Sequence, residues 1–328
     1  MRIHVQNDPT DPMPVTPAEF DAAAARAGAA GLEVSYGDSP PALAEGIARA
    51  EVLVTTPSEI VGQFPPGHLD QAAPNLKMIF CTAAGMDKLA PFDWLPPRVA
   101  LLNNRGVHAA KAFEYALMAL TLLNTGLPAM IAAQQAGRWA PHHAPTLRGR
   151  QVAIIGTGAL GSACARAARL CGCTVTGLRT LREPHPDFDR IATIDALDSI
   201  LPLIDVLILA CPLTPATRNL LDRRRLALLP RGAALINIGR GGLVDQDALC
   251  DHLDSGRLAG AVLDVFTPEP IPPGHRLWTT RNLVITPHAA VDDPVRYNPD
   301  SLDLLFRNLA AWRAREAMPN SVDLARGY

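Results

Sequence analysis

Four side chains that can bind anions or move protons follow the last three apolar runs of the chain. They are Arg240 after the run 234–239, Asp264 and Glu269 around the end of 259–265, and His288 after 283–287. A guanidinium can bind a carboxylate through a planar fork, and an imidazole can exchange a proton near neutral pH. If the runs are neighbouring parallel strands, their ends meet at one edge of a sheet, where ligands bind. The set therefore predicts a functional site rather than scattered surface residues.

A second signal lies at residues 151–161, which read QVAIIGTGALG. The apolar run 152–155 predicts a buried parallel strand, and a G-x-G-x-x-G pattern and an alanine-rich helix follow it at once. Gly156 permits the tight turn, Gly158 lets the backbone approach a pyrophosphate, and Gly161 lets helix and strand pack closely. The N–H groups at the helix start favour phosphate. We therefore predict dinucleotide binding by Gly156, Thr157, Gly158, Ala159 and Leu160.

The end of the next strand, 174–178, bears on the choice of dinucleotide. An NAD-type fingerprint places an acidic residue there, roughly twenty residues past the glycines, to bind the ribose hydroxyls. This chain has Arg179 in that slot, with Thr180 and Arg182 beside it. Arginine and a hydroxyl favour a 2′-phosphate. The sequence thus favours NADP(H), with NAD(H) possible if Arg179 is only a solvated loop residue.

Length and charge narrow the class of protein. The chain has 328 residues, enough for two domains, and a formal net charge of −2 from 30 basic and 32 acidic residues. This balance does not favour a nucleic-acid or membrane partner. No apolar run approaches the roughly 20 residues of a membrane span, and the N-terminus lacks a signal-peptide core, so we expect a cytoplasmic protein. The six cysteines form no C-x-x-C pair, so we predict no metal site.

Strands alternate with helices along the whole chain, which predicts parallel, doubly wound α/β sheets. We expect strands at 2–6, 32–36, 51–55, 76–82, 99–103, 152–155, 174–178, 206–210, 234–239, 259–265 and 283–287. We expect helices at 16–28, 41–50, 107–127 and 303–315, with a connector at 137–150. Two further strand ends could contribute to a ligand site. Thr55 closes the third strand. The small residues 81–87 close the fourth, where they could offer backbone N–H groups to an anion or form an ordinary turn.

Several segments together resemble the D-isomer-specific 2-hydroxyacid dehydrogenase family, which includes phosphoglycerate dehydrogenases and glyoxylate/hydroxypyruvate reductases. These segments are AGMD at 84–87, GTGALG at 156–161, PLTPATRNLL at 212–221, NIGRGGLVDQDAL at 237–249, SGRLAGAVLDVFTPEP at 255–270, LVITPHAA at 283–290 and the closing 319–328. The resemblance covers nearly the whole chain. It implies two doubly wound parallel-sheet domains, with a Rossmann cofactor domain at 105–292 inserted into a flavodoxin-like substrate domain at 1–104 and 293–328. It also implies a homodimer.

The resemblance further implies roles for individual residues. Arg240 would bind the substrate carboxylate, His288 would be the acid–base group, and Glu269 would be its partner. The reaction would move a hydride between nicotinamide and a small 2-keto or D-2-hydroxy acid, with His288 donating the proton in reduction. Substrate contacts would also come from Thr55, Ala84 and Gly85. Cofactor contacts would come, besides the glycine loop and the 179–182 segment, from Cys211, Pro212, Thr217, Ile238, Gly239, Asp264 and His288.

Some alternatives stay open. The chain could be an NAD(H)-linked enzyme of the phosphoglycerate type, or a non-catalytic dinucleotide-sensing protein like the corepressors of this fold. A formate dehydrogenase is disfavoured, because a resemblance to that branch of the family would imply a glutamine at the position of Glu269. The segment AAVDDP after His288 lacks the glycine often found there, so the identity of the 2-hydroxy acid is not determined. The sequence also does not determine the reaction direction, the oligomeric state or any role of Cys211.

Overall fold

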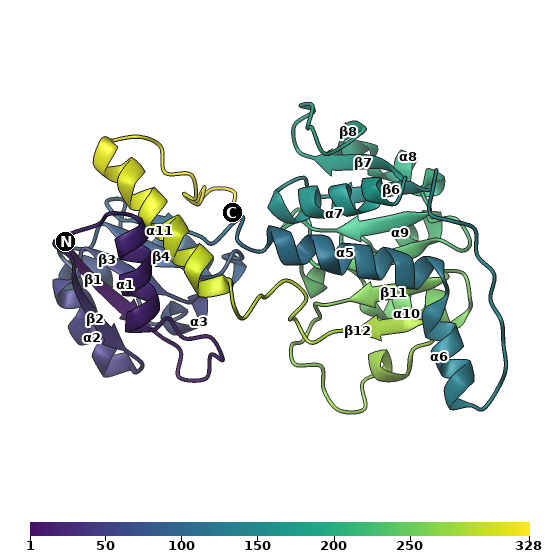
Figure 1. Ribbon diagram of the computed structural model, residues 1–328, viewed down its shortest axis with the longest axis horizontal. Coiled ribbons are helices and arrows are strands. Elements are labelled where there is room, and N and C mark those ends of the chain that lie inside the picture. Colours follow the sequence, from purple (N-terminus) through teal and green to yellow (C-terminus); the bar gives the residue numbers. More distant parts are fainter. The chain divides into compact units, whose positions relative to one another are not determined.

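The computed structural model describes all 328 residues, which form two compact units. Unit 1 consists of residues 1–107 and 293–328, and unit 2 of residues 108–292 (Figure 1). The chain leaves unit 1 after Val107, three residues later than the predicted crossing. The reason is that Asn104 is tied into unit 1, where its amide donates to Thr82 O at 3.0 Å and to Ser301 Oγ at 2.8 Å.

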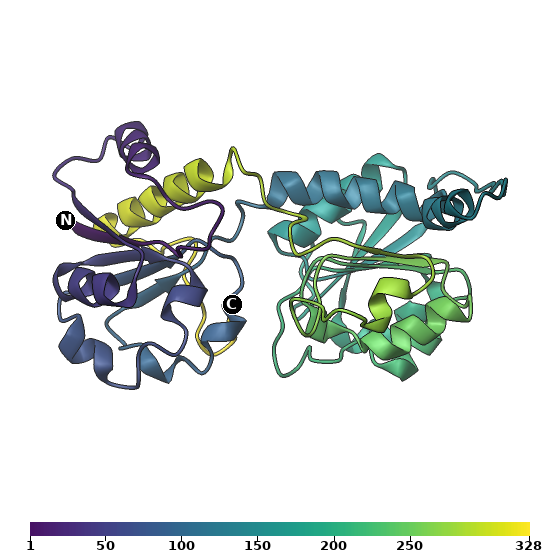
Figure 2. The same cartoon turned by 90° about the horizontal axis from the view of Figure 1, so that it is seen from below.

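Unit 1 is built around a five-stranded parallel sheet in the order β2-β1-β3-β4-β5. Its elements are β1 (Arg2–Gln6), α1 (Pro17–Arg26), β2 (Glu33–Gly37), α2 (Pro40–Arg49), β3 (Val52–Thr55), α3 (Pro57–Ile60), α4 (His68–Ala72), β4 (Met78–Cys81), β5 (Ala100–Leu102) and α11 (Tyr297–Ala314). This is the flavodoxin-like doubly wound order, which confirms the prediction for this part of the fold. Helices α1 and α11 pack together on one face of the sheet, and α2 to α4 cover the other (Figure 2).

Local sequence signals explain how the helices of unit 1 begin. Thr16 caps α1: its hydroxyl accepts from the Glu19 N–H at 3.3 Å, and the Glu19 carboxylate accepts from the Thr16 N–H at 2.9 Å. Helix α11 begins at Tyr297, six residues before the predicted start. Pro299 makes this stretch read as a loop, but it lies in the first turn, where a helix leaves N–H groups unpaired and tolerates proline.

Unit 2 holds a seven-stranded parallel sheet in the order β12-β11-β10-β9-β6-β7-β8. Its elements are α5 (Ala109–Asn124), α6 (Leu127–Gln135), β6 (Gln151–Ile155), α7 (Ala159–Leu170), β7 (Thr174–Arg179), β8 (Arg190–Thr193), α8 (Leu197–Ile200), β9 (Val206–Leu209), α9 (Arg223–Leu228), β10 (Ala234–Asn237), α10 (Gln246–Asp254), β11 (Gly260–Leu263) and β12 (Leu283–Ile285). The order is that of a Rossmann fold and confirms the second predicted sheet. Strand β8 was not predicted, because its exposed and half-buried residues lack an apolar run.

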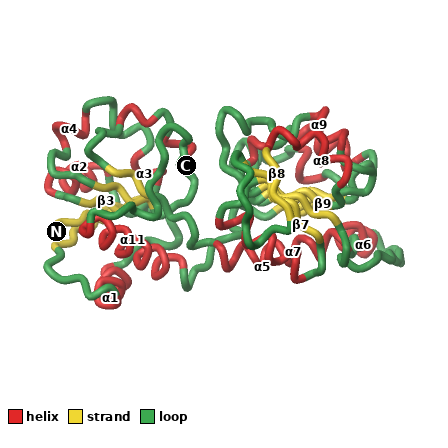
Figure 3. Tube along the Cα trace, turned by 90° about the horizontal axis from the view of Figure 1, so that it is seen from above, coloured by secondary structure: helices red, strands yellow, loops and turns green.

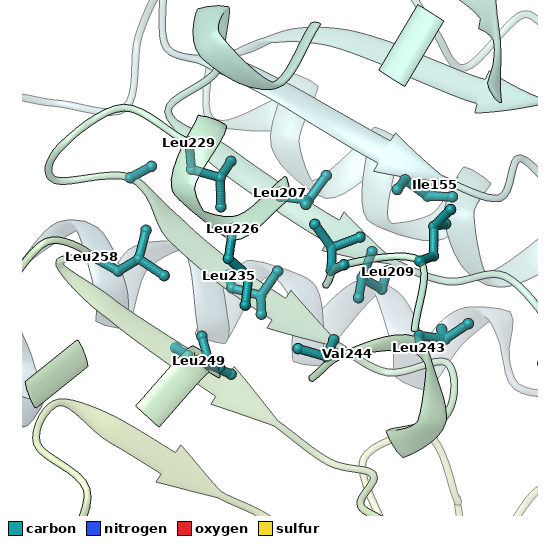
Figure 4. Packing of buried hydrophobic residues seen from close by; sticks show 14 of the residues in the cluster. Ile155, Leu207, Leu209, Leu226, Leu229, Leu235, Leu243, Val244, Leu249 and Leu258 are labelled. Atoms are coloured by element: carbon teal, nitrogen blue, oxygen red, sulfur yellow. The ribbon is translucent and has the colours of Figure 1, made fainter. Parts of the chain in front are cut away.

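Each face of this sheet has its own apolar core, because successive side chains of a strand point to opposite faces. Ile154 joins the core beneath α5 and α7, whereas Ile155 joins the core beneath α8, α9 and α10. Figure 3 shows the strands between these two helical layers. Figure 4 shows the second core, in which Leu207, Leu209 and Leu235 meet side chains from α9 and α10. Burial on both faces explains the continuous apolar runs of the sequence.

The helix predicted over 107–127 is α5, and a second helix, α6, which was not predicted, follows it at once. Helix α5 ends at Asn124, Gly126 adopts the left-handed conformation with φ of +66°, and α6 begins at Leu127. Glycine adopts this conformation without steric cost, so it ends one helix and redirects the chain. No single helix of the chain is long and apolar enough to cross a bilayer, although α5 and α6, bent by 65°, reach that length and composition together.

Candidate active site

The predicted residues of unit 2 gather at one edge of its sheet. Because all seven strands are parallel, their carboxyl ends share that edge. The residues that follow these ends are Gly156 after β6, Arg179 at the end of β7, Cys211 after β9, Arg240 after β10, Asp264 after β11 and His288 after β12. The strand order reverses between β6 and β9, which is where ligands bind in such sheets, and the glycine loop lies at this point.

The clearest chemical pair in the set is His288 with Glu269. His288 Nδ1 lies 2.9 Å from Glu269 Oε2, and the other carboxylate oxygen accepts from the Phe266 N–H at 2.7 Å. The hydrogen bond to Glu269 raises the pKa of His288 above its ordinary value, against the opposing effect of burial. Burial raises the pKa of Glu269, but the bonds from His288 and Phe266 outweigh it and leave that pKa lowered. Nδ1 is thus occupied, and Nε2 is the nitrogen that can exchange a proton with a ligand.

The backbone of His288 is held in an unusual conformation. Its φ is +51°, in the left-handed region that residues other than glycine rarely adopt. Asp264 secures the turn: its carbonyl accepts from the His288 N–H at 2.9 Å, and its carboxylate accepts from the N–H groups of Ala289 and Ala290 at 3.0 and 3.1 Å. Such strained residues cluster at active sites and need a surrounding structure that enforces them.

Arg240 belongs to the same cluster. The loop that carries it is fixed by Asn237, whose amide donates to Arg240 O at 2.9 Å and accepts from the Gly239 N–H at 3.0 Å. The guanidinium donates to Gly239 O at 2.8 Å. Its positive charge lowers the pKa of both Glu269 and His288. Arg240 therefore acts electrostatically on both members of the pair.

A second histidine, His108, lies in this cluster and was not predicted. It is buried at the start of α5, with Nδ1 at 3.4 Å from Val291 O and 3.7 Å from Asp292 Oδ1. Burial lowers the pKa of His108, and the charges of Arg240 and His288 lower it further. The local sequence does not distinguish a buried histidine at the start of a helix from a solvated one, so only the tertiary contacts show that His108 belongs to this cluster.

The glycine loop after β6 has the geometry that the sequence predicts. Gly156 has a φ of +98°, and a Cβ placed on Gly161 would lie 1.8 Å from Gly156 O, so only glycine lets α7 approach β6 this closely. Gly158 precedes the first residue of α7, and a Cβ placed on it would meet no protein atom within 4 Å. The backbone is therefore open at Gly158, and the N–H groups of Ala159 and Leu160 lie in the first turn of the helix.

The predicted specificity segment lies at the end of β7. Arg179 is half-buried and pairs with Glu183 at 3.6 Å, while Arg182 is exposed. Because Glu183 is exposed, this ion pair contributes little stability, and an incoming phosphate could replace Glu183 as the partner of Arg179.

The loop after β9 carries three predicted cofactor residues. Thr217 closes a turn there, accepting from the Thr214 N–H and donating to Pro212 O, both at 2.8 Å. Burial raises the pKa of the Cys211 thiol to about 12, so it is protonated at neutral pH and not a nucleophile.

The predicted substrate residues of unit 1 lie at the carboxyl edge of the other sheet. Thr55 ends β3, is buried, and donates its hydroxyl to Thr56 O at 3.4 Å. Ala84 and Gly85 follow β4 in a partly exposed loop, and Ala84 O accepts from the Asn103 amide at 3.2 Å. All three lie at the carboxyl edge of this sheet, and their contact with substrate stays a prediction.

Comparison with known proteins assigns the chain to a family. Residues 117–290 match the family model "D-isomer specific 2-hydroxyacid dehydrogenase, NAD binding domain". The human protein named glyoxylate reductase/hydroxypyruvate reductase is 34% identical over 318 residues, covering 94% of this chain and 95% of the human protein.

Two solved structures extend the likeness to the whole fold. A D-isomer specific 2-hydroxyacid dehydrogenase from Xanthobacter autotrophicus Py2, in complex with NADPH and MES, superposes with a TM-score of 0.82 at 29% identity, covering 99% of each chain. An NADPH-dependent glyoxylate/hydroxypyruvate reductase from Sinorhizobium meliloti, in complex with NADP and sulfate, gives a TM-score of 0.82 at 27% identity, covering 100% of this chain and 99% of that one. The chain therefore belongs to the D-isomer-specific 2-hydroxyacid dehydrogenase family of NAD(P)-dependent oxidoreductases.

Proposed function

We propose that this protein transfers a hydride between NADP(H) and a small 2-keto or D-2-hydroxy acid, with glyoxylate and hydroxypyruvate as the first candidates. The observation that carries the proposal is the His288–Glu269 pair at 2.9 Å, beside Arg240 and at the same sheet edge as the glycine loop. Relatives named glyoxylate/hydroxypyruvate reductase support the substrate class.

The residues of unit 2 fit a dinucleotide. The open backbone at Gly158 leaves room for a pyrophosphate, and the first turn of α7 directs N–H groups and a positive dipole end toward it. Ile238, Gly239 and Cys211 follow the neighbouring strands and would line the nicotinamide half. When bound, the reduced cofactor supplies the hydride; the chain's own residues bind the acid and move the proton.

In reduction, Arg240 would hold the substrate carboxylate in a two-pronged ion pair. The carbonyl oxygen gains charge as its carbon accepts the hydride. The proton on His288 Nε2 would pass to that oxygen, and Glu269 would keep the imidazole charged until it does. Oxidation of the hydroxy acid is the same path reversed.

We propose NADP(H) as the preferred cofactor. Arg179 occupies the slot where an NAD-type site has a carboxylate, and Thr180 adds a hydroxyl. Neighbouring structures are complexes with NADPH or NADP, which supports this preference. The second candidate, an NAD(H)-linked enzyme of the phosphoglycerate type, is favoured only by the Glu183 partner that Arg179 already has.

The test is a spectrophotometric assay of the purified protein with glyoxylate, hydroxypyruvate and a panel of larger 2-keto acids, each with NADPH and NADH. We expect kcat/KM to be highest with a small 2-keto acid and NADPH. NADH as the better reductant would favour the second candidate. Tight NADPH binding without turnover of any 2-keto acid would favour the dinucleotide-sensing alternative.

We also propose that the protein works as a homodimer in the cytoplasm. The apolar side chains of Met118, Leu127, Ile131 and Trp139 are exposed on α5, on α6 and just beyond it, and Trp139 is 96% exposed. Exposed apolar side chains gathered in one segment are typical of a surface covered by another protein. Sedimentation equilibrium of the wild type and of Trp139→Ser tests this, and a monomeric wild type contradicts it.

A further inference from the structure

A chain of side-chain hydrogen bonds runs from helix α5 to the turn that carries His288. Tyr115 Oη lies 2.7 Å from Thr286 Oγ1, and Thr286 Oγ1 lies 2.6 Å from Asp264 Oδ1. The same carboxylate oxygen accepts from the N–H groups of Ala289 and Ala290. Asp264 is 2% exposed and Tyr115 7%, and Thr286 between them is half-buried.

The groups at the two ends of this series of hydrogen bonds determine which group donates and which accepts at each step. An ionised Asp264 can only accept hydrogen bonds, so the Thr286 hydroxyl must donate its hydrogen bond to the carboxylate. The Thr286 oxygen is then left as an acceptor, and Tyr115 must donate to it. Burial raises the pKa of Tyr115 to about 12, which keeps its hydroxyl protonated throughout the working range. Tyr115 is therefore a permanent donor that fixes the orientation of the Thr286 hydroxyl.

The hydrogen bonds from Tyr115 through Thr286 to Asp264 lead to a strained backbone segment. His288 has a φ of +51°, and the turn from Thr286 to Ala290 is held through the carbonyl and carboxylate of Asp264. A buried carboxylate keeps its place only if its lone pairs are satisfied, and Thr286 supplies the side-chain part of that satisfaction. Loss of the Tyr115 hydroxyl frees Thr286 to rotate, which loosens Asp264 and with it the turn.

We propose that Tyr115 and Thr286 are positioning residues for the acid–base histidine: through Asp264 they hold the backbone of His288 so that its imidazole meets Glu269. Tyr115 comes from the core of α5, so the rigid helix serves as the anchor of the turn. The proposal rests on the function assigned to His288 above, and neither residue touches substrate or cofactor in it.

The test uses Tyr115→Phe, which removes only the hydroxyl, together with Thr286→Val and Thr286→Ser. We expect Tyr115→Phe and Thr286→Val to lower kcat by about three- to thirty-fold with less than a twofold change in the keto-acid KM, because misplacement of a catalytic group acts on the chemical step. The basic limb of the pH profile for reduction should move to lower pH, since a looser contact with Glu269 stabilises the imidazolium less. Thr286→Ser keeps a hydroxyl and should restore most of the rate.

A readout without catalysis separates this proposal from the proposed function. Hydrogen exchange at the Ala289 and Ala290 amides should accelerate at least tenfold in Tyr115→Phe. Thr121→Val is the matched control, because the Thr121 hydroxyl bonds only to carbonyls of its own helix, α5. Wild-type rates and exchange in Tyr115→Phe would overturn the positioning role alone, whereas wild-type turnover in His288→Gln would overturn the proposed function.

Discussion

At the scale of single residues, the site is defined by one charged pair and the cation beside it. The hydrogen bond to Glu269 raises the pKa of His288, while burial and the charge of Arg240 oppose this shift. A general acid works best when its pKa lies near the working pH. The two opposing charges therefore tune the same proton that the proposed reaction transfers.

The first prediction concerns that proton. His288→Gln should lower kcat for 2-keto acid reduction by about two to four orders of magnitude, as expected for loss of a general acid. Binding of NADPH, measured by fluorescence titration, should stay within a few-fold of wild type. Turnover near the wild-type level would remove His288 from the proposed role.

The pH dependence provides a second prediction. Reduction needs the imidazolium, so kcat/KM should fall as pH rises through the raised pKa of His288, and oxidation should show the opposite slope. Glu269→Gln removes the negative charge that raises the pKa of His288, while Arg240 remains. The fall in kcat/KM for reduction should therefore occur at lower pH. Parallel pH profiles of both directions measure this. If kcat/KM for reduction fell at the same pH in the wild type and in Glu269→Gln, Glu269 would not determine the pKa of His288.

Cofactor choice is also a residue-scale question. Arg179→Asp should reduce kcat/KM for NADPH relative to NADH by about tenfold or more, because a carboxylate repels a 2′-phosphate and each 1.4 kcal/mol corresponds to a factor of ten. Glu183→Gln is the control: it removes the ion-pair partner at 3.6 Å but leaves the arginine, so the preference for NADPH should persist. A wild type that prefers NADH would contradict the assignment of this slot.

At the scale of elements, the glycine loop joins β6 to α7, and two of its glycines serve different ends. Gly161 is required by the protein itself, since its Cβ would clash with Gly156 O at 1.8 Å. Gly158 meets no protein atom, so the fold alone does not require it. A matched pair of alanine variants can therefore separate packing from ligand binding.

Gly161→Ala should lower the free energy of unfolding by about 1–3 kcal/mol through overpacking, and weaken NADPH binding with it. Gly158→Ala should leave the unfolding midpoint close to wild type, yet raise the Kd for NADPH, because its methyl group occupies the space proposed for the pyrophosphate. Thermal unfolding and fluorescence titration measure the two quantities. Unchanged NADPH affinity in Gly158→Ala would place the cofactor elsewhere.

At the scale of the whole molecule, each unit has its own sheet and its own apolar cores. A ligand stabilises the part of a protein that binds it, by about 2.7 kcal/mol at one hundred times its Kd. Saturating NADPH should therefore slow hydrogen exchange in the strands of unit 2 more than in those of unit 1, with Gly158→Ala as the unresponsive control. Equal protection of both sheets would contradict assignment of the cofactor to unit 2.

The sequence by itself determined the two sheets, because parallel strands covered on both faces leave continuous apolar runs that can be read locally. It also placed Arg240, Asp264, Glu269 and His288 at strand ends, since position along a strand is a local property. Helix and strand boundaries were less accurate where a local signal conflicted with tertiary packing. Pro299 hid the first turn of α11, α6 beyond Gly126 was not predicted, and the edge strand β8 had no apolar run.

Only the tertiary structure decided which side chains support the site. His108 and Tyr115 are separated from His288 by more than half the chain, and no spacing in the sequence connects them to it. Their contacts, to Val291 O and to the Thr286 hydroxyl, exist because α5 packs against the sheet that carries β12. The left-handed backbone of His288 likewise needs Asp264 from a neighbouring strand. Hydrogen bonds between distant segments depend on three-dimensional packing, which local residue patterns do not encode.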